Sequence, residues 1–261
     1  FYDAAGRLDL VNQFNGAVTD YTYDAANRLT SLVNRKANGT VISSHQFPIL
    51  DGNGNRLQEV REEPITPAPQ TATVNFSYNA PRNRLTGTTN DTFSYDNEGQ
   101  QTNKSGTLYT FDDAHRLTQI GNNTQFFYDG ANNRLKATRN GITTKYIYDA
   151  GNNLLAEANN SNQIQRYYIH GAGLLGLVEG SNLYTYHYDA TGNTLALTNA
   201  IGNIIDTYSY TAYGQIANES EIIPQPFKYV GQYGVQYEAQ QNTYYMRARY
   251  YDPTTGRFIS E

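Results

Sequence analysis

A short phrase recurs along the whole chain, and this repetition constrains the fold more than any other feature of the sequence. In its fullest form the phrase reads Tyr23-Asp24-Ala25-Ala26-Asn27-Arg28-Leu29. Clear copies begin at Tyr2, Tyr23, Phe111, Tyr128 and Tyr148, and weaker copies begin at Leu50, Tyr78, Tyr95, Tyr188 and Tyr251. One short repeat cannot bury its apolar face alone, so neighbouring repeats must stack. The sequence therefore predicts a stacked array that covers most of the chain.

Each copy of the phrase has the composition of a β-hairpin turn. Upstream of the turn, aromatic residues alternate with polar ones, as at Tyr21 and Tyr23, and a period of two places both rings on one face of a strand. The Asp can accept a hydrogen bond from the backbone two residues on, and the Gly or Asn three residues after it can adopt a positive φ. A second set of turns, such as Asn38-Gly39 and Asn140-Gly141, lies between these copies. We predict an all-β chain that forms a long antiparallel meander, with two strands per repeat and no long helix.

Composition excludes several classes of protein. Aromatic residues make up 13% of the 261 residues, mostly as 24 Tyr, which supplies buriable surface and favours strands. The net charge is -5 and no basic block stands out, so we expect no nucleic-acid partner. No apolar run is long enough to span a membrane as a helix. The lack of Cys excludes disulfides, thiolate catalysis and cysteine metal sites, and no phosphate or dinucleotide fingerprint indicates a cofactor.

One proline-rich segment, near residues 62–70, interrupts the pattern. It contains Pro64, Pro67 and Pro69, and proline cannot donate a hydrogen bond to a sheet. Because the phrase resumes afterwards, we predict an extended surface loop at the tip of a long hairpin rather than a linker between domains.

The repeats resemble the YD repeats of the Rhs family, which includes bacterial Rhs toxins, the C component of Tc toxins, wall-associated bacterial proteins and animal teneurins. The end of the chain is more specific, because it is similar to the Rhs-associated core signature. That similarity rests on Pro226-Phe227-Lys228-Tyr229-Val230-Gly231-Gln232 and Tyr244-Tyr245-Met246-Arg247-Ala248-Arg249-Tyr250-Tyr251-Asp252-Pro253-Thr254-Thr255-Gly256-Arg257-Phe258-Ile259-Ser260-Glu261. The resemblance divides the chain into a YD-repeat array over residues 1–225 and a core signature over residues 226–261. The chain departs from the family pattern in two places: Glu238-Ala239-Gln240-Gln241-Asn242-Thr243 is longer than the usual Glu-Thr-Gly-Leu, and an Asp-Pro continuation is expected after Glu261.

The resemblance implies both a fold and a function. In the family, antiparallel hairpins spiral into a curved or hollow shell, the core signature closes one end, and an aspartyl autoprotease releases a toxin inside. We accordingly expect a bacterial, secreted or cell-surface shell segment that encapsulates a C-terminal toxin. Its partners would be that toxin, neighbouring repeats of a longer parent chain, and a secretion or toxin-complex protein. We expect the chain itself not to be an enzyme, because the protease aspartates would lie beyond Glu261.

Two other functions stay open. Rows of Tyr on a flat sheet would suit a surface adhesin that binds glycans or partner proteins. Alternatively, the autoprotease could be complete within this chain. Aspartyl proteases need two carboxylates that share a proton, and Asp252 in the core signature is a candidate for one of them. Alternatively, Asp252 is the turn Asp of the last repeat.

Two arginines of the core signature are candidate orienting residues. Arg247 and Arg249 are two positions apart, so we expect them on one face of a strand, where they could hold a carboxylate or peptide through paired hydrogen bonds. Their alternative interpretation is packing on neighbouring tyrosines.

A weak metal candidate lies in an early repeat. Asp51, Asn53 and Asn55 imitate the start of a calcium loop, but Arg56 stands where such a loop needs Gly, and the segment also fits the repeat phrase. The four histidines are not spaced like metal ligands, and we expect His115 and His170 at turns.

Overall fold

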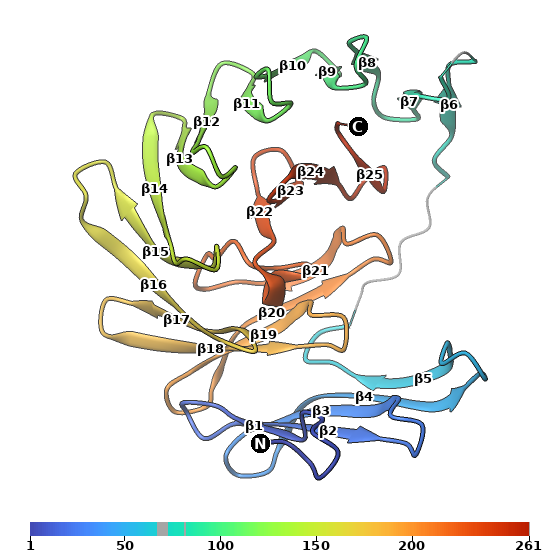
Figure 1. Ribbon diagram of the computed structural model, residues 1–261, viewed down its shortest axis with the longest axis vertical. Helices are drawn as coiled ribbons and strands as arrows, with labels where there is room; N and C mark the ends of the chain where they lie inside the picture. The colour runs from blue at the N-terminus through green and yellow to red at the C-terminus, as the bar shows by residue number, and fades with distance from the viewer. Residues whose placement is uncertain (67–72, 81, 261) are drawn as a thin grey trace. The chain divides into compact units, whose positions relative to one another are not determined.

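The computed structural model describes residues 1–66, 73–80 and 82–260, and nearly all regular structure in these ranges is β-strand. The exception is a short 3-10 helix, η1 (Gly231–Tyr233). Strands lie in sequence order within each sheet and pair antiparallel with their neighbours (Figure 1). No helix in the described ranges is long and apolar enough to cross a membrane. The predicted all-β antiparallel fold is confirmed.

The chain divides into two compact units. The first unit combines Phe1–Ala68 with Tyr167–Val235, and the second combines Pro69–Arg166 with Gln236–Glu261. Each unit therefore joins an early stretch of repeats to a later stretch of the chain. This division differs in kind from the predicted boundary at residue 225, which stays a prediction.

The first unit holds two series of strands, each hydrogen-bonded in sequence order. The first series is β1 (Leu10–Asn12), β2 (Val18–Tyr23), β3 (Leu29–Arg35), β4 (Val41–Leu50) and β5 (Arg56–Glu62). The second series is β17 (Gly173–Glu179), β18 (Asn182–Tyr188), β19 (Thr194–Asn199), β20 (Ile204–Tyr210) and β21 (Ile216–Ser220). The boundary between the units lies within β16 (Ile164–Gly171).

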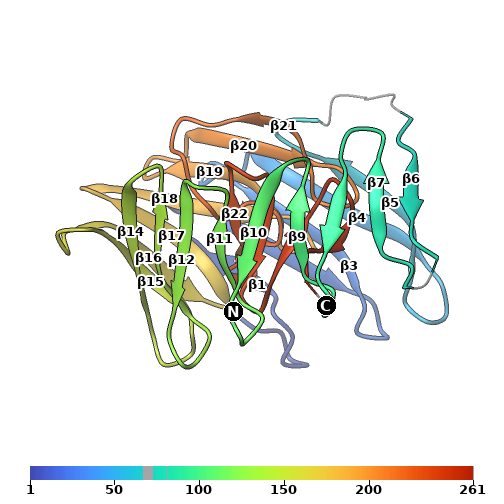
Figure 2. The same ribbon diagram turned by 90° about the horizontal axis from the view of Figure 1, so that it is seen from above.

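The second unit holds three series, and Figure 2 shows its repeat strands alternating in direction. A short hairpin is formed by β6 (Phe76–Tyr78) and β7 (Leu85–Thr88). The repeat strands that follow are β8 (Phe93–Tyr95), β9 (Gln101–Lys104), β10 (Thr107–Phe111), β11 (Leu117–Ile120), β12 (Thr124–Tyr128), β13 (Arg134–Arg139), β14 (Ile142–Tyr148) and β15 (Leu154–Asn159). The core signature adds β22 (Gln236–Glu238), β23 (Thr243–Met246), β24 (Arg249–Asp252) and β25 (Arg257–Phe258).

The strands that flank the proline-rich segment do not form one hairpin. Strand β5 pairs with β4 and strand β6 pairs with β7, so the strands on either side of the segment belong to different sheets. The hairpin-tip prediction is therefore wrong. Residues 67–70 themselves lie outside the described residues.

The repeated phrase forms the turn that the sequence predicts. Asp24 Oδ1 accepts the N–H groups of Ala26 (2.9 Å) and Arg28 (3.0 Å), and Asn27 has a φ of 63°. These hydrogen bonds, above all the one from the Arg28 backbone, hold the pKa of Asp24 below its usual value. The same two backbone bonds form at seven other turn aspartates: Asp3, Asp51, Asp96, Asp112, Asp129, Asp149 and Asp189.

The Arg of the phrase links its own turn to the next one. Arg28 Nε donates to Asp24 Oδ2 (2.6 Å), and its Nη1 donates to the carbonyl of Asp51 in the following turn (2.6 Å). Arg116 makes the same pair of contacts, with Asp112 (2.8 Å) and the Asp129 carbonyl (2.8 Å). The side chain therefore ties successive repeats together.

The Tyr of the phrase makes the reciprocal contact, because its hydroxyl donates to a backbone carbonyl at the start of the preceding return strand. Tyr23 bonds Leu8 (2.9 Å) and Tyr128 bonds Leu117 (2.7 Å) in this way. A β-bulge directly before the Tyr sets its position, as between Thr22 and Tyr23. The copies that begin at Tyr23 and Phe111 are thus bonded forward through Arg, and those that begin at Tyr23 and Tyr128 are bonded backward through Tyr. These bonds give a physical reason for the presence of both residues in the phrase.

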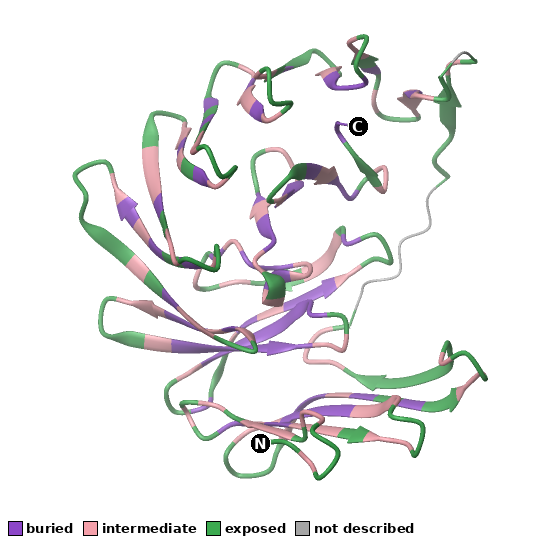
Figure 3. Cartoon of the chain, viewed as in Figure 1, coloured by how far each residue is buried: buried purple, intermediate pink, exposed green. Residues whose placement is uncertain are grey.

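The core of the first unit lies on both faces of β18 and β19, which are buried over most of their length (Figure 3). On one face, the Tyr186 hydroxyl donates to Gln225 Oε1 (3.1 Å) in the segment that follows β21. On the other face, Asn15 Nδ2 from the β1–β2 turn donates to Thr198 Oγ1 (2.8 Å). In the second unit, by contrast, strands such as β12 alternate buried and exposed residues, so Phe126 is buried and Phe127 is 42% exposed.

Candidate functional site

The first part of the core signature lies across β18 and β19 of the first unit. Thr194 holds it, donating its N–H to the Lys228 carbonyl (2.9 Å) and its hydroxyl to the Phe227 carbonyl (2.7 Å). The Phe227 ring meets the edge of Tyr168, with 4.9 Å between the ring centroids. Gly192 is needed here for space, because a Cβ on it would lie 2.5 Å from the Tyr233 ring. The signature is therefore built into the sheet rather than attached to it.

A partly buried charge cluster, which was not anticipated from the sequence, secures the same segment. Lys228 Nζ lies 2.8 Å from Glu219 Oε2 and 3.1 Å from Glu221 Oε1, and Tyr208 donates to Glu221 (2.7 Å). Asp206 accepts two backbone N–H groups directly after Glu221, at 2.6 and 3.1 Å. Burial raises the pKa of Asp206, although these two hydrogen bonds oppose the shift. The cluster ties the signature to β20 and β21.

The second part of the core signature lies on the buried face of the repeat strands in the second unit, and a charge cluster joins the two. Glu238 accepts hydrogen bonds from Arg134 and from Arg139, whose Nη2 and Nε lie at 2.7 Å from its two oxygens. Arg134 also donates to Gln236 Oε1 (2.5 Å) and to the Tyr250 hydroxyl (3.1 Å). The side chains of Arg134 and Glu238 are 1% and 2% exposed, so the charges are removed from water and satisfied by each other.

The electrostatics of this cluster are set by its two arginines. Burial alone would raise the pKa of Glu238, but the charges of Arg134 and Arg139 outweigh burial and hold that pKa below its usual value. The Arg134 guanidinium also lies over the rings of Tyr245 (4.3 Å) and Tyr146 (4.9 Å). The cluster can position a polypeptide, but its carboxylate is kept ionised and paired.

Arg134 was missed as a site residue, although the sequence carries a signal for it. In the copies at Asp3, Asp24 and Asp112 the Arg stands four residues after the turn Asp, but in this copy Asn133 occupies that place and donates to Asp129 Oδ2 (3.0 Å). The inserted Asn moves Arg134 on by one residue, and a shift of one position turns a side chain to the opposite face of a strand. The same spacing occurs at Asp51 and Arg56, where the Arg is exposed, so this signal does not by itself identify the contact with the signature.

Asp252, the candidate protease aspartate, lies on the same buried face. Its Oδ2 is 2.7 Å from Lys104 Nζ, and its Oδ1 accepts the N–H (2.8 Å) and the hydroxyl (2.5 Å) of Thr254. Its carbonyl accepts the N–H of Gly256, which has a φ of 67°. This is the geometry of a turn Asp, and its side chain faces an ammonium group.

The structure separates the two candidate arginines. Arg247 has a φ of 60° and lies in the turn between β23 and β24, whereas Arg249 begins β24. The expectation that both lie on one strand face is therefore wrong, because a tight turn reverses the chain between them. Arg249 lies over the Phe258 ring at 3.8 Å, so it packs on an aromatic ring, but not on a tyrosine.

The weak calcium candidates form a repeat turn. Asp51 accepts the N–H groups of Asn53 (2.9 Å) and Asn55 (2.8 Å), and Asn55 Nδ2 donates to its second oxygen (2.7 Å). Among the histidines, His115 lies at a turn with a φ of 62°, as expected, but His170 lies in strand β16. Among the described residues, no group of three potential ligands is placed to hold a metal ion.

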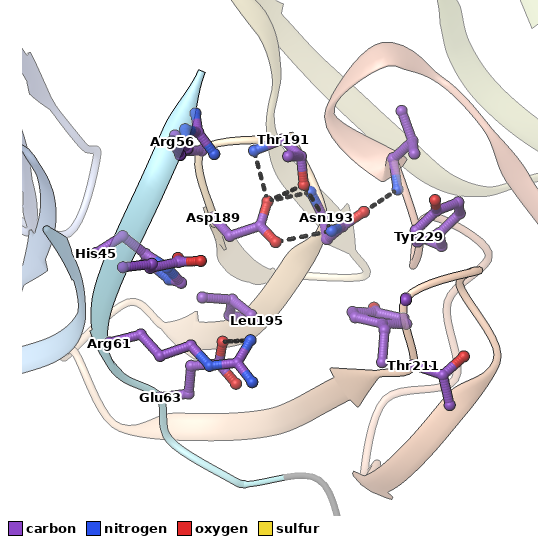
Figure 4. A pocket seen from close by; sticks show the side chains of 15 residues that line it. His45, Arg56, Arg61, Glu63, Asp189, Thr191, Asn193, Leu195, Thr211 and Tyr229 are labelled. Carbon is purple, nitrogen blue, oxygen red and sulfur yellow. Dashed lines mark hydrogen bonds and ion pairs between the residues drawn. The ribbon is translucent and has the colours of Figure 1, made fainter. Parts of the chain in front are cut away.

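A cavity of about 390 Å³ in the first unit lies beside β5 and the turns that follow β18 and β20 (Figure 4). His45 Nδ1 lies 2.9 Å from Glu59 Oε1 at its wall, and Arg61 lies 3.6 Å from Glu63. The Glu63 side chain is 8% exposed, and burial raises its pKa. Asp189, also in the wall, bonds its own turn. The cavity was not anticipated from the sequence, and its charged groups are largely paired with one another.

A sequence model of the teneurin YD-shell family matches residues 1–261. The chain belongs to the teneurin YD-shell family. This match confirms the Rhs/YD-repeat resemblance and identifies a shell-type Rhs domain.

Curated relatives of this YD-shell chain include a much longer protein. The chain is 31% identical over 308 residues to the tRNA(Glu)-specific nuclease WapA of Bacillus subtilis subsp. natto, and the match covers 99% of the chain but 13% of that protein. A stretch of 69 residues is 41% identical to the putative uncharacterized protein YlbH of Escherichia coli, covering 26% of this chain and 28% of YlbH.

Solved structures share the fold at low sequence identity. The crystal structure of TcdB2-TccC3-TEV matches with a TM-score of 0.71 and 16% identity, covering 100% of this chain and 18% of that chain. The crystal structure of TcdB2-TccC3-Cdc42 matches with a TM-score of 0.67 and 15% identity, with the same coverage. At such identities the likeness concerns the fold alone.

Proposed function

We propose that this YD-shell chain is a section of wall that encloses a toxin polypeptide, and that it catalyses no reaction itself. One observation carries the proposal: the polar side chains of the phrase are bonded within their own turn or to the neighbouring one. For example, the Asp24 carboxylate, the Arg28 guanidinium and the Tyr23 hydroxyl all form hydrogen bonds within their turn or to a neighbouring repeat. Because these side chains are hydrogen-bonded to the repeats themselves, they stabilise the sheet and do not form a substrate site.

The relatives support a toxin as the cargo. WapA is named as a nuclease, and this chain corresponds to 13% of it, which leaves ample sequence for a separate effector in a protein of that kind. The TcdB2-TccC3 chains that share the fold are likewise much longer than this one. We accordingly place the chain in an extracellular or cell-surface toxin, with the effector of its parent polypeptide and neighbouring repeats as partners.

The rival function, an adhesin with rows of exposed Tyr, receives less support from the structure. Many rings of these rows are buried, including Tyr109, Tyr146, Tyr168, Tyr186 and Tyr208. A buried ring cannot stack on a sugar, so the rows do not offer a continuous aromatic platform.

Limited proteolysis of the full-length product of the gene, tagged at both ends, tests the proposal. We expect a protease-resistant segment outside residues 1–261 that becomes sensitive when Glu238→Ala weakens the signature. Equal cleavage of all flanking sequence in the native and the denatured protein would rule out enclosure. Autocleavage that Asp252→Asn abolishes would instead establish an active protease.

A further inference from the structure

A lysine between two aspartates lies where β9 meets the core signature in the second unit. Lys104 Nζ is 2.7 Å from Asp252 Oδ2 and 3.6 Å from Asp91 Oδ2. We propose that Lys104 and Asp252 condense to form an intramolecular amide bond, with Asp91 as the proton acceptor.

Burial distinguishes this pair from an ordinary ion pair. The side chain of Asp252 is 2% exposed and that of Lys104 is 16% exposed, and the Phe93 ring lies 5.8 Å from Nζ. Lys228 also contacts carboxylates, but those of Glu219 and Glu221 are 40% and 19% exposed. Holding two reacting groups in contact and away from water gives a very high effective concentration, which favours condensation over hydrolysis.

The two oxygens of Asp252 have different surroundings, as an acyl transfer requires. Oδ1 accepts the N–H (2.8 Å) and the hydroxyl (2.5 Å) of Thr254, so these donors can stabilise negative charge on it when Nζ adds to Cγ. Oδ2 faces Lys104 and is the oxygen that leaves.

Asp91 is held in place to move the protons. The Ser105 hydroxyl donates to Asp91 Oδ1 (2.8 Å), which leaves Oδ2 toward Lys104 Nζ. Asp91 takes one proton from the ammonium group, so that Nζ gains the lone pair it needs to attack.

The reaction balances without any other reagent. The Nζ–Cγ bond forms and the Cγ–Oδ2 bond breaks. Two of the three ammonium protons, one carried by Asp91, end on Oδ2, which departs as water. An ammonium and a carboxylate thus become an amide and water, with no change of oxidation state. The bond would join residues 148 positions apart in a chain that has no cysteine.

Intact-mass spectrometry of the denatured 261-residue chain tests the proposal. We expect a mass lower than that of the sequence by one water, and one branched tryptic peptide that contains both Lys104 and Asp252. Lys104→Arg keeps the positive charge but cannot form this amide, so it should show the full sequence mass. Asp91→Asn should slow formation by about a hundredfold. The matched control Lys228→Arg should still lose the water.

Circular dichroism of each variant separates a failure of chemistry from a failure to fold. If Lys104→Arg does not fold, the peptide map of the wild-type chain and the rate of water loss in Asp91→Asn test whether the amide forms. A folded wild-type chain that keeps its full mass after prolonged incubation would overturn the proposal, as would a water loss that maps to other residues. Unchanged formation in Asp91→Asn would overturn the role of Asp91.

Discussion

Strands β18 and β19 of the first unit and strands β8–β14 of the second are built from the same phrase but are buried differently. In the first unit, five consecutive residues of each of the two strands are buried, so both faces are covered. In the second unit, buried and exposed residues alternate, as in β10 and β12. The repeat therefore determines the hairpin but not the number of its faces that are covered.

The difference follows from what each unit adds to its sheet. In the first unit, β1–β4 and the segment after β21 supply a layer on each side, through contacts such as Asn15 with Thr198 and Tyr186 with Gln225. In the second unit, β22–β24 cover the face that carries Arg134 and Phe126. Each apolar group removed from water contributes to stability, so a layer on both faces should make the first unit less tolerant of substitution.

The largest expected effect on stability comes from introducing a charge into a repeat strand, and we compare β19 of the first unit with β10 of the second. Ala196 in β19 is fully buried, so Ala196→Asp should cost more than about 4 kcal/mol of unfolding free energy, because the new charge has no partner. Thr110 in β10 is exposed, and Thr110→Asp should change stability by no more than about 0.5 kcal/mol. Urea denaturation of both variants measures the contrast. Equal losses would mean that the two sheets are not covered differently.

A slightly smaller effect is expected at the charge cluster of the second unit. Glu238→Ala leaves Arg134 buried without its carboxylate and should cost about 3–5 kcal/mol. Hydrogen exchange should show the loss in β12–β14 and β22–β24, with β18 and β19 protected as before. Glu62→Ala, in an exposed strand, is the control and should be nearly neutral. A loss of less than about 1 kcal/mol for Glu238→Ala would show that the cluster does not hold the signature.

Acid should weaken the first unit before the second. Burial lowers the pKa of His187 from its usual 6.5 to about 4. Between these values the unfolded chain binds a proton that the folded chain does not, so stability falls as the pH is lowered, by up to about 3 kcal/mol. Glu238 has a lowered pKa, so its contribution persists to more acidic pH. Unfolding free energies measured from pH 7 to 4 should show this slope, and His187→Gln should flatten it. A slope that survives in His187→Gln would assign it to other groups.

The smallest effect is expected at the Tyr hydroxyls that link repeats. Tyr188 is buried and donates to the Leu174 carbonyl (2.7 Å), so Tyr188→Phe should cost about 1–2 kcal/mol. Tyr148 is half-buried and donates to the Arg134 carbonyl (3.1 Å). Water can replace that hydroxyl, and Tyr148→Phe should cost about 1 kcal/mol or less. Thermal unfolding of the two variants compares them, and a larger loss at Tyr148 would contradict the difference in burial.

Much of the fold could be predicted from the sequence because turn formation is local. Asp24 and Asn27 lie within one turn, and their hydrogen bonds and backbone angles depend on residues no more than four positions away. The same holds for the Asn-Gly turns, so the strands and their antiparallel order follow from the phrase. The core signature could be recognised for a similar reason, since its residues are nearly contiguous.

The candidate site was less predictable, because its contacts join residues far apart in the sequence. The spacing of Arg247 and Arg249 predicted that both lie on one strand face, but Arg247 lies in the turn that precedes the strand of Arg249. Arg134 and Glu238, which carry the contact, are 104 positions apart and occur in different motifs.

The sequence by itself determined the repeated hairpins and their order, because the turns depend on short-range hydrogen bonds and on steric limits of the backbone. Tertiary structure alone decided which faces are covered, where the signature packs, and which charged residues are buried. Those outcomes depend on removing surface from water and on matching charges between distant segments. A repeat presents nearly the same surface in every copy, so its sequence cannot specify which copies other layers will cover.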